Sequence, residues 1–314
     1  MVKDHHLCNE SAQLHGQTVT SYVLDVVVVS LSLLIICGNL LVIISVIYFK
    51  QLHTPTNFLI LSLAVTDLLV GALVLPFSAI LSMSSCWYSG YLLCKMRDLF
   101  DILLCASSIL NLCCISIDRY YAVCHPLTYK SKMNGCVTLT IILVSWTLSA
   151  LLAIAINVRG KGEENLNCEI FVATKESSPG PIFAFYIPAI IILTIYLKIL
   201  TVAKGQARRI QNTLKSEAAL SKMEKKANVT LTIVLGVFLI CWTPFFVSQG
   251  LYSMGRLTIP IVVIEAFKWL GWSNSMLNPL VYAFFYRWFR NAFTIIISGK
   301  IFQGNFTSAN LCHS

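Results

Sequence analysis

Charged residues are scarce in this chain. Of its 314 residues, only 12% are charged, whereas 57% are hydrophobic. A soluble globule of that composition would not have enough polar surface to cover itself. The scarcity of charge therefore excludes a soluble protein and indicates one that is embedded in a lipid bilayer.

Residue patterns typical of enzymes are missing too. The sequence contains no nucleophile–base set and no cluster with metal-ligand spacing, and its close histidine pair, His5-His6, lies in an N-terminal tail. We therefore expect neither catalytic activity nor a cofactor. The net charge of +9 would suit a nucleic-acid partner, but the basic residues fall mostly in alternate loops, so we expect no nucleic acid to bind.

Long apolar runs are abundant instead. A helix needs about 20 apolar residues to cross a bilayer, and such runs recur at residues 22–48, 56–82, 92–117, 134–157, 177–199, 227–252 and 258–284. We therefore predict an all-α membrane protein, a bundle of seven transmembrane helices. The predicted domains are an extracellular tail at 1–20, the bundle at 21–285, and a short amphipathic helix with a cytoplasmic tail at 286–314.

Basic residues set the orientation of these spans. They gather after the first, third, fifth and seventh spans, so the positive-inside rule makes these loops cytoplasmic and places the N-terminus outside. Residues 1–20 lack the apolar core of a signal peptide, and we expect the first span to direct insertion. Asn9 heads a glycosylation acceptor, Asn9-Glu10-Ser11, on the outer side.

Four of the twelve cysteines lie on the predicted outer side, where disulfides persist: Cys8, Cys86, Cys94 and Cys168. Cys94 opens the third span and Cys168 lies in the loop after the fourth, so a bridge between them would pin that loop over the mouth of the bundle. Four cysteines allow three pairings, and the sequence leaves all three open. We carry Cys94–Cys168 forward as the predicted disulfide.

Polar and kinking residues inside the spans are few. A charged residue at the bilayer centre costs roughly 2.5–3.5 kcal/mol on insertion scales and tends to face the bundle interior. In chain order these positions are Asn39, Asp67, Asp101, Asp118-Arg119-Tyr120, Trp146, Pro188, Cys241-Trp242-Thr243-Pro244 and the run from Asn274 to Tyr282.

This ordered set resembles the rhodopsin-like, class A G-protein-coupled receptors, and the resemblance covers nearly everything from Asn39 to Phe289. Each span supplies one of the family's markers, and the last is Asn278-Pro279-Leu280-Val281-Tyr282. Within the class, residues 274–289 are similar to the fingerprint of trace amine-associated receptors, NSxxNPxx(Y/H)xxx(Y/F)xWF, at every fixed position.

The resemblance implies a conformational switch in the inner half of the bundle. An ionic latch would hold Arg119 against Asp118 and release it to meet a heterotrimeric G protein, of the stimulatory or olfactory type that raises cyclic AMP. The implied switch residues are Asp118, Arg119, Tyr120, Pro244, Asn278, Pro279 and Tyr282. The alternative for the triplet is snorkelling to the lipid headgroups. The family also implies expression in olfactory sensory neurons.

A second set of polar residues would converge in the middle of such a bundle: Asp67, Ser108, Asn274, Ser275 and Asn278. A buried carboxylate needs partners or a cation. The resemblance implies a sodium ion held there in the resting state, and the alternative is a neutral network linked by water.

Asp101 interrupts the apolar stretch "DLFDILLC" in the third span. It lies 18 residues before Arg119, roughly 27 Å along a helix, and so near the outer mouth, within reach of a ligand. The resemblance implies that this aspartate is the counter-ion of a protonated amine, with aromatic faces adding cation–π attraction. We predict a ligand site of Asp101, Ile102, Cys105, Trp242, Phe245, Phe246, Trp272 and Glu265. The alternative for Asp101 is an internal pair with Arg97, four residues earlier.

Glu265 decides which amine we expect. It lies two turns before Trp272 on the same helical face, so Asp101 and Glu265 would grip the two ends of cadaverine, putrescine or spermine. Lys268 offers the alternative, because it is placed to pair with Glu265 and would repel a dication. In that case Asp101 alone would bind an aryl monoamine such as phenylethylamine, tyramine or a histamine-like ligand.

Two further observations narrow the function. Gly180, Pro181 and Ala184 stand where catecholamine receptors place serines, so catechol ligands are disfavoured. A cation-coupled amine transporter is the alternative from another class, since its path would be lined by intramembrane carboxylates. The odd number of spans and the lack of a visible inverted repeat argue against transport.

Overall fold

The computed structural model describes residues 19–83, 87–159, 180–210, 233–251 and 259–302. Its regular elements in these ranges are helices. They are α2 (Val19–Tyr48), η1 (Lys50–Leu52), α3 (Pro55–Leu69), η2 (Val70–Val74), α4 (Leu75–Met83), α5 (Trp87–Cys124), α6 (Pro126–Lys132), α7 (Gly135–Arg159), α9 (Gly180–Ile210), a helix at Ile233–Leu251, α11 (Ile261–Phe285), α12 (Arg287–Ile297) and η3 (Lys300–Phe302).

Five of the described helical segments are long and apolar enough to cross a membrane: Val26–Tyr48, Pro55–Ile80, Leu93–Cys124, Gly135–Val158 and Ile233–Leu251. The apolar part of α9 is shorter, at Phe185–Ile199. The remaining long helix, α11, carries Glu265, Lys268 and several polar residues between Ser273 and Asn278. Of these, Lys268, Asn274, Ser275 and Asn278 are buried, whereas the side chain of Glu265 is 35% exposed.

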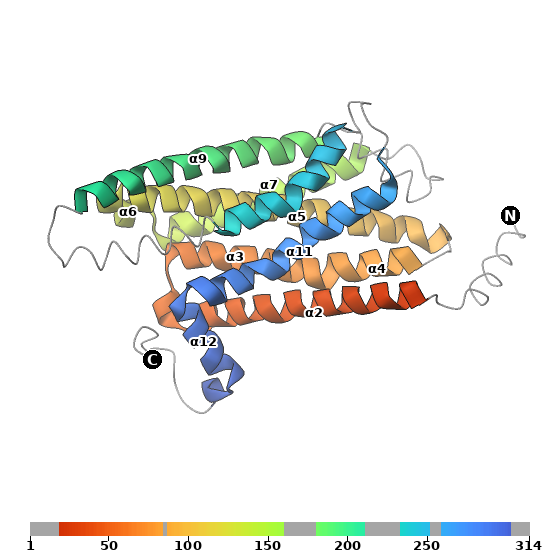
Figure 1. Cartoon of the computed structure of the whole chain (residues 1–314), viewed down its shortest axis with the longest axis horizontal. Helices are drawn as coiled ribbons and strands as arrows, with labels where there is room; N and C mark the ends of the chain where they lie inside the picture. The colour runs from red at the N-terminus through yellow and green to blue at the C-terminus, as the bar shows by residue number, and fades with distance from the viewer. Residues whose placement is uncertain (1–18, 84–86, 160–179, 211–232, 252–258, 303–314) are drawn as a thin grey trace, which may run out of the picture.

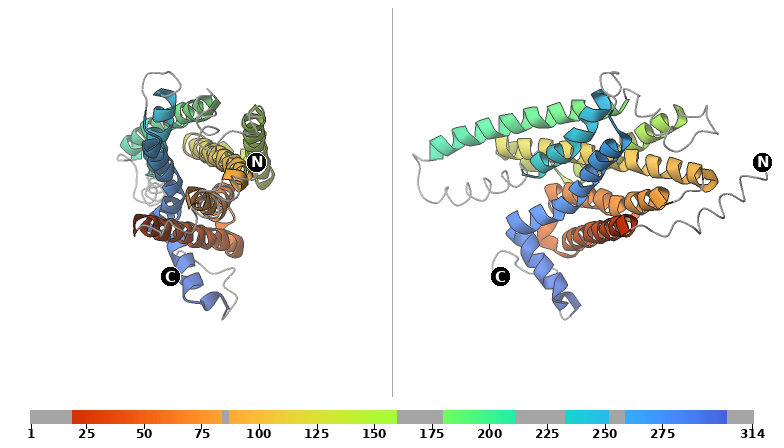
Figure 2. Two further views of the ribbon diagram at one scale, coloured as in Figure 1. Left: turned by 90° about the vertical axis from the view of Figure 1, so that its right-hand side faces the viewer. Right: turned by 45° about the vertical axis from the view of Figure 1, so that its right-hand side comes forward.

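The long helices run side by side, with α5 in the middle of the bundle (Figure 1). Helix α5 packs against α3, α7 and α9, while α2 packs against α3 and α11. Seen end-on, α12 leaves the bundle beside α2, against which it also packs (Figure 2). The third helix extends from Trp87 to Cys124 and is therefore longer at both ends than the predicted run at 92–117.

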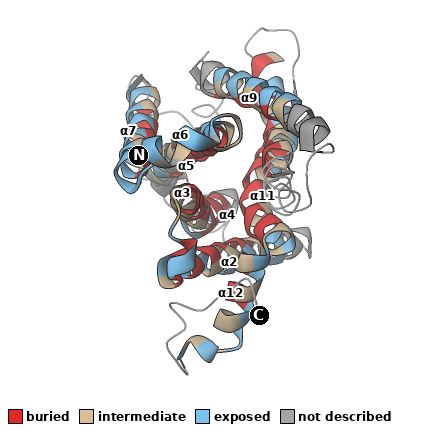
Figure 3. Cartoon of the chain, turned by 90° about the vertical axis from the view of Figure 1, so that its left-hand side faces the viewer, coloured by how far each residue is buried: buried red, intermediate tan, exposed pale blue. Residues whose placement is uncertain are grey.

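Burial follows an inside-out pattern that suits a bilayer. Buried residues line the inner faces of the helices, and the outward faces of α2, α7 and α9 are exposed (Figure 3). Those outward faces are apolar, with Leu34, Leu143 and Ile190 each more than half exposed. Because exposed aliphatic side chains gain nothing from water, this surface fits the hydrocarbon core of a membrane.

A π-helical turn, η2, divides the second span between α3 and α4. Gly71 lies in this turn, and a Cβ added there would be 2.7 Å from Cγ2 of Ile35. The Ser32 hydroxyl donates a hydrogen bond to the Gly71 carbonyl. The lack of a side chain at Gly71 thus allows α2 to approach the second span closely.

Helix α11 ends where Tyr286 adopts an extended conformation, with φ −101° and ψ 109°. The chain then turns into α12, whose Phe289, Ala292 and Phe293 are buried while Arg287 and Arg290 are exposed. This segregation makes α12 amphipathic, and its position at the end of the bundle suits a helix lying along the membrane surface.

Candidate functional site

Asp101 is joined to α11 by a hydrogen bond. Trp272, which is buried on α11, donates its indole Nε1–H to Oδ1 of Asp101 at 2.7 Å. Among the described residues, Oδ2 of Asp101 accepts no hydrogen bond from a side chain or from the backbone. The carboxylate therefore keeps an oxygen for a further donor.

Two cations surround this carboxylate. Arg97 lies one helical turn before Asp101 on α5, with its guanidinium carbon 6.0 Å from the centre of the Trp272 ring. Lys268 lies one turn before Trp272 on α11 and is only 3% exposed. The positive charges of Lys268 and Arg97 both stabilise the Asp101 carboxylate. Arg97 nevertheless forms no ion pair with Asp101 in the part of the chain that the structure describes.

Glu265 pairs with Lys268. Oε1 of Glu265 lies 3.5 Å from Nζ of Lys268, and the side chain of Glu265 is 35% exposed. The Lys268 ammonium also lies 5.6 Å from the centre of the Phe245 ring, a cation–π distance. The arrangement that the sequence left as an alternative for Glu265 is thus the one in the structure, and the grip of a diamine by two carboxylates stays a prediction.

Aromatic rings form the floor and one wall of the site. Trp242 is buried, and its ring centre lies 6.0 Å from that of Phe245 and 5.8 Å from that of Phe246. Phe246 in turn stacks on Phe185 of α9, with ring centres 4.1 Å apart and an angle of 7° between the planes. The helix at Ile233–Leu251 is therefore attached to α9 through aromatic contacts.

The other predicted ligand residues lie on α5. Ile102 is partly buried next to Asp101, and Cys105, one turn further along, is a partly buried free thiol. Cys105 packs against the hydrophobic core of the bundle.

Asp67 is the centre of a buried polar network between α2, α3 and α11. Its Oδ1 accepts from the Ser275 hydroxyl at 2.8 Å, and its Oδ2 accepts from Nδ2 of Asn278 at 2.7 Å. Asn39 donates to the Ser275 carbonyl at 3.0 Å. Ser108 is a buried residue of α5. Of the predicted set, the structure thus joins Asp67, Ser275 and Asn278 by hydrogen bonds.

This network also contains acceptors that fit a cation. Asp67 is fully buried, and the Oδ1 atoms of Asn274 and Asn278 are buried without a hydrogen-bond donor in the described part of the chain. Unpaired buried oxygens are unfavourable unless a donor or a cation reaches them. A carboxylate with amide and hydroxyl oxygens beside it is a suitable donor set for a sodium ion.

A second buried network lies at the inner end of α5. Asp118 accepts from Arg119 at 2.8 Å, from Thr56 at 2.7 Å and from the Tyr129 hydroxyl at 2.7 Å. Arg119 also donates to Thr56. The ion pair therefore lies between the N-terminus of α3 and the loop helix α6. Tyr120 is partly buried and makes edge contacts with its neighbour Tyr121.

Cys94 near the start of α5 is disulfide-bonded. Cys168, its predicted partner, and Asn9, the predicted glycosylation site, lie outside the described residues. Both assignments therefore stay predictions.

The 7 transmembrane receptor (rhodopsin family) model matches residues 38–282. Trace amine-associated receptor 1 of Mus musculus is 43% identical, with 98% of this chain and 99% of the relative aligned. Trace amine-associated receptor 2 of Rattus norvegicus is 41% identical over 88% of this chain and 85% of its own. The chain belongs to the trace amine-associated receptors of the rhodopsin family. Its seven-transmembrane fold and the absence of an enzymatic role follow from that family.

Two contacts in the bundle were not anticipated from the sequence. Tyr282 is buried, with its ring centre 5.7 Å from that of Phe289 on α12, a contact that links α11 to the amphipathic helix. Gly271 was missed altogether. A Cβ on Gly271 would lie 2.7 Å from the Trp242 ring, so α11 presses against Trp242 at that point.

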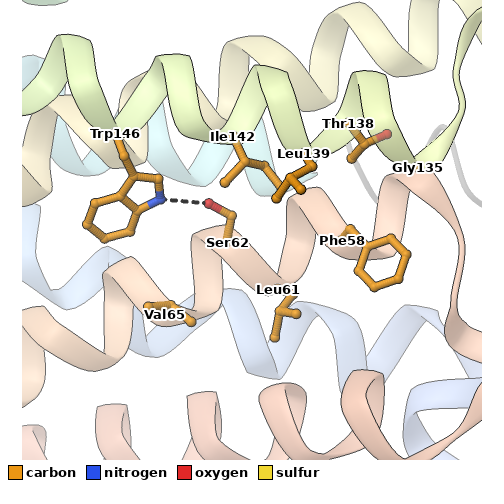
Figure 4. Close-up of a pocket in the computed structure, with 9 residues that line it drawn as sticks. All are labelled: Phe58, Leu61, Ser62, Val65, Gly135, Thr138, Leu139, Ile142 and Trp146. Atoms are coloured by element: carbon orange, nitrogen blue, oxygen red, sulfur yellow. Dashed lines mark hydrogen bonds between the residues drawn. The ribbon is translucent and has the colours of Figure 1, made fainter.

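An apolar groove of about 540 Å³ lies on the outside of the receptor between α3 and α7. Trp146 closes one end and donates its indole N–H to the Ser62 hydroxyl at 3.0 Å, while Phe58 lies at the other end (Figure 4). The groove contains neither Asp101 nor Glu265. It is therefore separate from the predicted amine site.

Proposed function

We propose that this receptor binds a protonated amine at Asp101 and signals through a stimulatory G protein. The observation that supports the proposal best is the Asp101 carboxylate itself, which receives one hydrogen bond, at Oδ1 from Trp272, and keeps Oδ2 available beside aromatic rings. A primary ammonium donates to Oδ2 while its carbon skeleton lies against the rings of Trp272 and Phe245. The similar receptors are named for trace amines, which supports this class of ligand.

The ligand acts on the switch through Trp242. An aryl group held by Asp101 presses on the Trp242 and Phe245 rings, and the helix that carries them bends at Pro244. Movement of its inner end opens a cytoplasmic cavity. Arg119 leaves Asp118 and contacts the G protein, which raises cyclic AMP. We further propose that the receptor acts at the plasma membrane of olfactory sensory neurons.

A cyclic-AMP assay with phenylethylamine, tyramine and histamine tests the anchor. Loss of a buried charge partner costs 2–5 kcal/mol, so Asp101→Ala should raise the agonist concentration for half response by roughly thirtyfold or more. Asp98→Asn, at a carboxylate three residues earlier, serves as the comparison. Equal potency on wild type and Asp101→Ala, at equal surface expression, would refute the amine site.

A second candidate is a receptor for diamines or polyamines. The 35% exposure of the Glu265 side chain favours it, because a second ammonium can reach that carboxylate from outside. Such a ligand must replace the Lys268 ammonium at Glu265. Glu265→Gln should then weaken cadaverine, putrescine and spermine but leave phenylethylamine unchanged; an unchanged diamine response would eliminate the two-carboxylate grip.

Asp67, Ser108, Asn274, Ser275 and Asn278 are the residues that would hold an allosteric sodium ion, which would stabilise the resting bundle. The unpaired Oδ1 of Asn274 supports this proposal. Replacing sodium by choline in the assay medium should increase agonist potency on wild type and leave Asp67→Asn unaffected. Melting of the purified receptor at higher temperature in sodium than in choline would provide the same test without signalling.

Two covalent features complete the proposal. The disulfide of Cys94 joins Cys168 and holds the loop after α7 over the ligand site, and a glycan is attached at Asn9. Non-reducing peptide mapping and a mobility shift after glycosidase treatment test the two assignments.

A further inference from the structure

Arg97 carries hydrogen-bond donors that nothing satisfies. It is 6% exposed, and its Nε and Nη2 atoms are buried with no hydrogen-bond partner in the part of the chain that the structure describes. A buried guanidinium with unpaired donors is unfavourable by several kcal/mol in general, because it has lost water without gaining a replacement. The arrangement is stable when an acceptor occupies that edge.

Two carboxylates of the site accept hydrogen bonds from side chains other than Arg97. Asp101 accepts from Trp272, and Glu265 accepts from Lys268. Asp98 has interactions of its own, and the next residue along a helix points about 100° away from its neighbour. None of the three accepts a hydrogen bond from Nε or Nη2 of Arg97.

Arg97 and Asp101 carry opposite charges on the same face of α5. They are four residues apart on α5 and so lie on one face, one turn from each other. Trp272 lies across both: its ring is 6.0 Å from the Arg97 guanidinium carbon, and its N–H is bonded to Asp101. A cationic subsite and an anionic subsite thus share one aromatic wall.

We propose that the preferred ligand is a zwitterion, an aromatic amine that also carries a carboxylate close to its ammonium group. This inference rests on the proposed function, since the ammonium again binds Oδ2 of Asp101. The carboxylate of the ligand binds the edge of the Arg97 guanidinium that carries Nε and Nη2. Two parallel N–H donors on that edge match the two oxygens of a carboxylate.

Amino acids and the amines formed from them by decarboxylation provide the test. Phenylalanine and phenylethylamine, tyrosine and tyramine, and histidine and histamine each differ by one carboxylate. A charge-assisted pair of hydrogen bonds should make the amino acid more potent than its amine by roughly tenfold or more in the cyclic-AMP assay. The methyl ester of each amino acid keeps the ammonium group but has no carboxylate charge. Its potency should therefore equal that of the amine.

The variants separate this inference from the proposed function. Arg97→Gln should remove the difference within each pair, and Arg97→Lys should retain part of it, because lysine keeps the charge but lacks the fork. Asp101→Ala should abolish the response to both the amino acid and the amine of each pair. Because the comparison within a pair is also made on wild type, it does not depend on whether the Arg97 variants fold.

Each outcome is decisive. If the amines activate wild type and the amino acids are equal or weaker, the zwitterion proposal is wrong and the amine receptor stands. If neither series activates a receptor shown to be at the cell surface, both proposals fail. If the amino acids are more potent but Arg97→Gln keeps the difference at normal surface expression, Arg97 is not the carboxylate site.

Discussion

The indole N–H of Trp272 and the carboxylate of Asp101 form a 2.7 Å hydrogen bond between residues that lie 171 positions apart in the chain. This bond joins α5, the central helix, to α11. We expect a ligand that binds Asp101 also to alter the position of α11, which carries Asn278, Pro279 and Tyr282 towards the inner face. The contact would then connect ligand binding to the predicted switch.

Trp272→Phe should weaken the response to amines by roughly tenfold or more. The change removes the hydrogen bond but keeps an aromatic face, and a hydrogen bond to a charged group contributes about 1.5 kcal/mol or more. Trp269→Phe is the matched control, since its ring packs edge-on against Trp272 with centres 5.0 Å apart. Concentration–response curves at equal surface expression give the measurement, and an equal effect of both variants would contradict a specific role for the indole N–H.

Gly271→Ala should raise signalling in the absence of ligand. The added methyl group would lie 2.7 Å from the Trp242 ring, so the ring has to move out of its resting position. The control is Gly236→Ala on the same helix as Trp242, where no atom of the described chain lies within 4 Å of the added Cβ. Basal cyclic AMP that is the same for both variants would show that the resting position of Trp242 does not restrain the switch.

Tyr129→Phe should also increase basal signalling, by roughly threefold to tenfold. It removes the 2.7 Å hydrogen bond from α6 to Asp118, and loss of about 1 kcal/mol from the resting state shifts the equilibrium by that factor. Tyr121→Phe, at a tyrosine that is 37% exposed, is the control. If basal signalling falls instead, the hydroxyl of Tyr129 supports the active state rather than the resting one.

Gly71→Ala should lower the stability of the receptor by about 1–3 kcal/mol, the usual effect of overpacking a tight contact. A methyl group there would lie 2.7 Å from Ile35, and α2 would have to move. Gly135→Ala places a methyl group in open space within the described chain and should have little effect. The measurement is the midpoint temperature of thermal inactivation for the two detergent-solubilised variants. Equal midpoints for Gly71→Ala and Gly135→Ala would mean that α2 adapts without strain.

The fold could be predicted from the sequence because a bilayer imposes a simple rule. Apolar runs of sufficient length become spans, and the polar residues within them, such as Asp67 and Asp118, face inward. The ends of the helices were less predictable. Helix α5 extends from Trp87 to Cys124, beyond the apolar run at both ends, because helical hydrogen bonding does not stop where an apolar run does.

The sequence could predict which charged and aromatic residues lie in the candidate site, but not which of them pair with one another. Spacing placed Asp101, Trp272 and Glu265 in the outer half of the bundle, but spacing does not tell whether Lys268 turns inward or out to water. Its burial depends on Glu265 and Phe245 together, and these residues meet only in the folded bundle. Gly271 carries no signal in a single sequence, because its importance comes from the Trp242 ring on another helix.

The π turn at Val70–Val74 has a consequence for how this receptor can vary. A turn of that kind contains an additional residue, so the outer part of the second span is rotated by about 100° relative to an unbroken α-helix. Beyond it, Phe77 stacks on Phe100 of α5, with ring centres 6.4 Å apart, while Asp67 lies before it. The outer and inner parts of one span are thereby decoupled in register. Length changes within the turn would redirect Phe77 on the ligand side while the Asp67 network kept its alignment, which gives evolution a way to alter specificity without altering the switch.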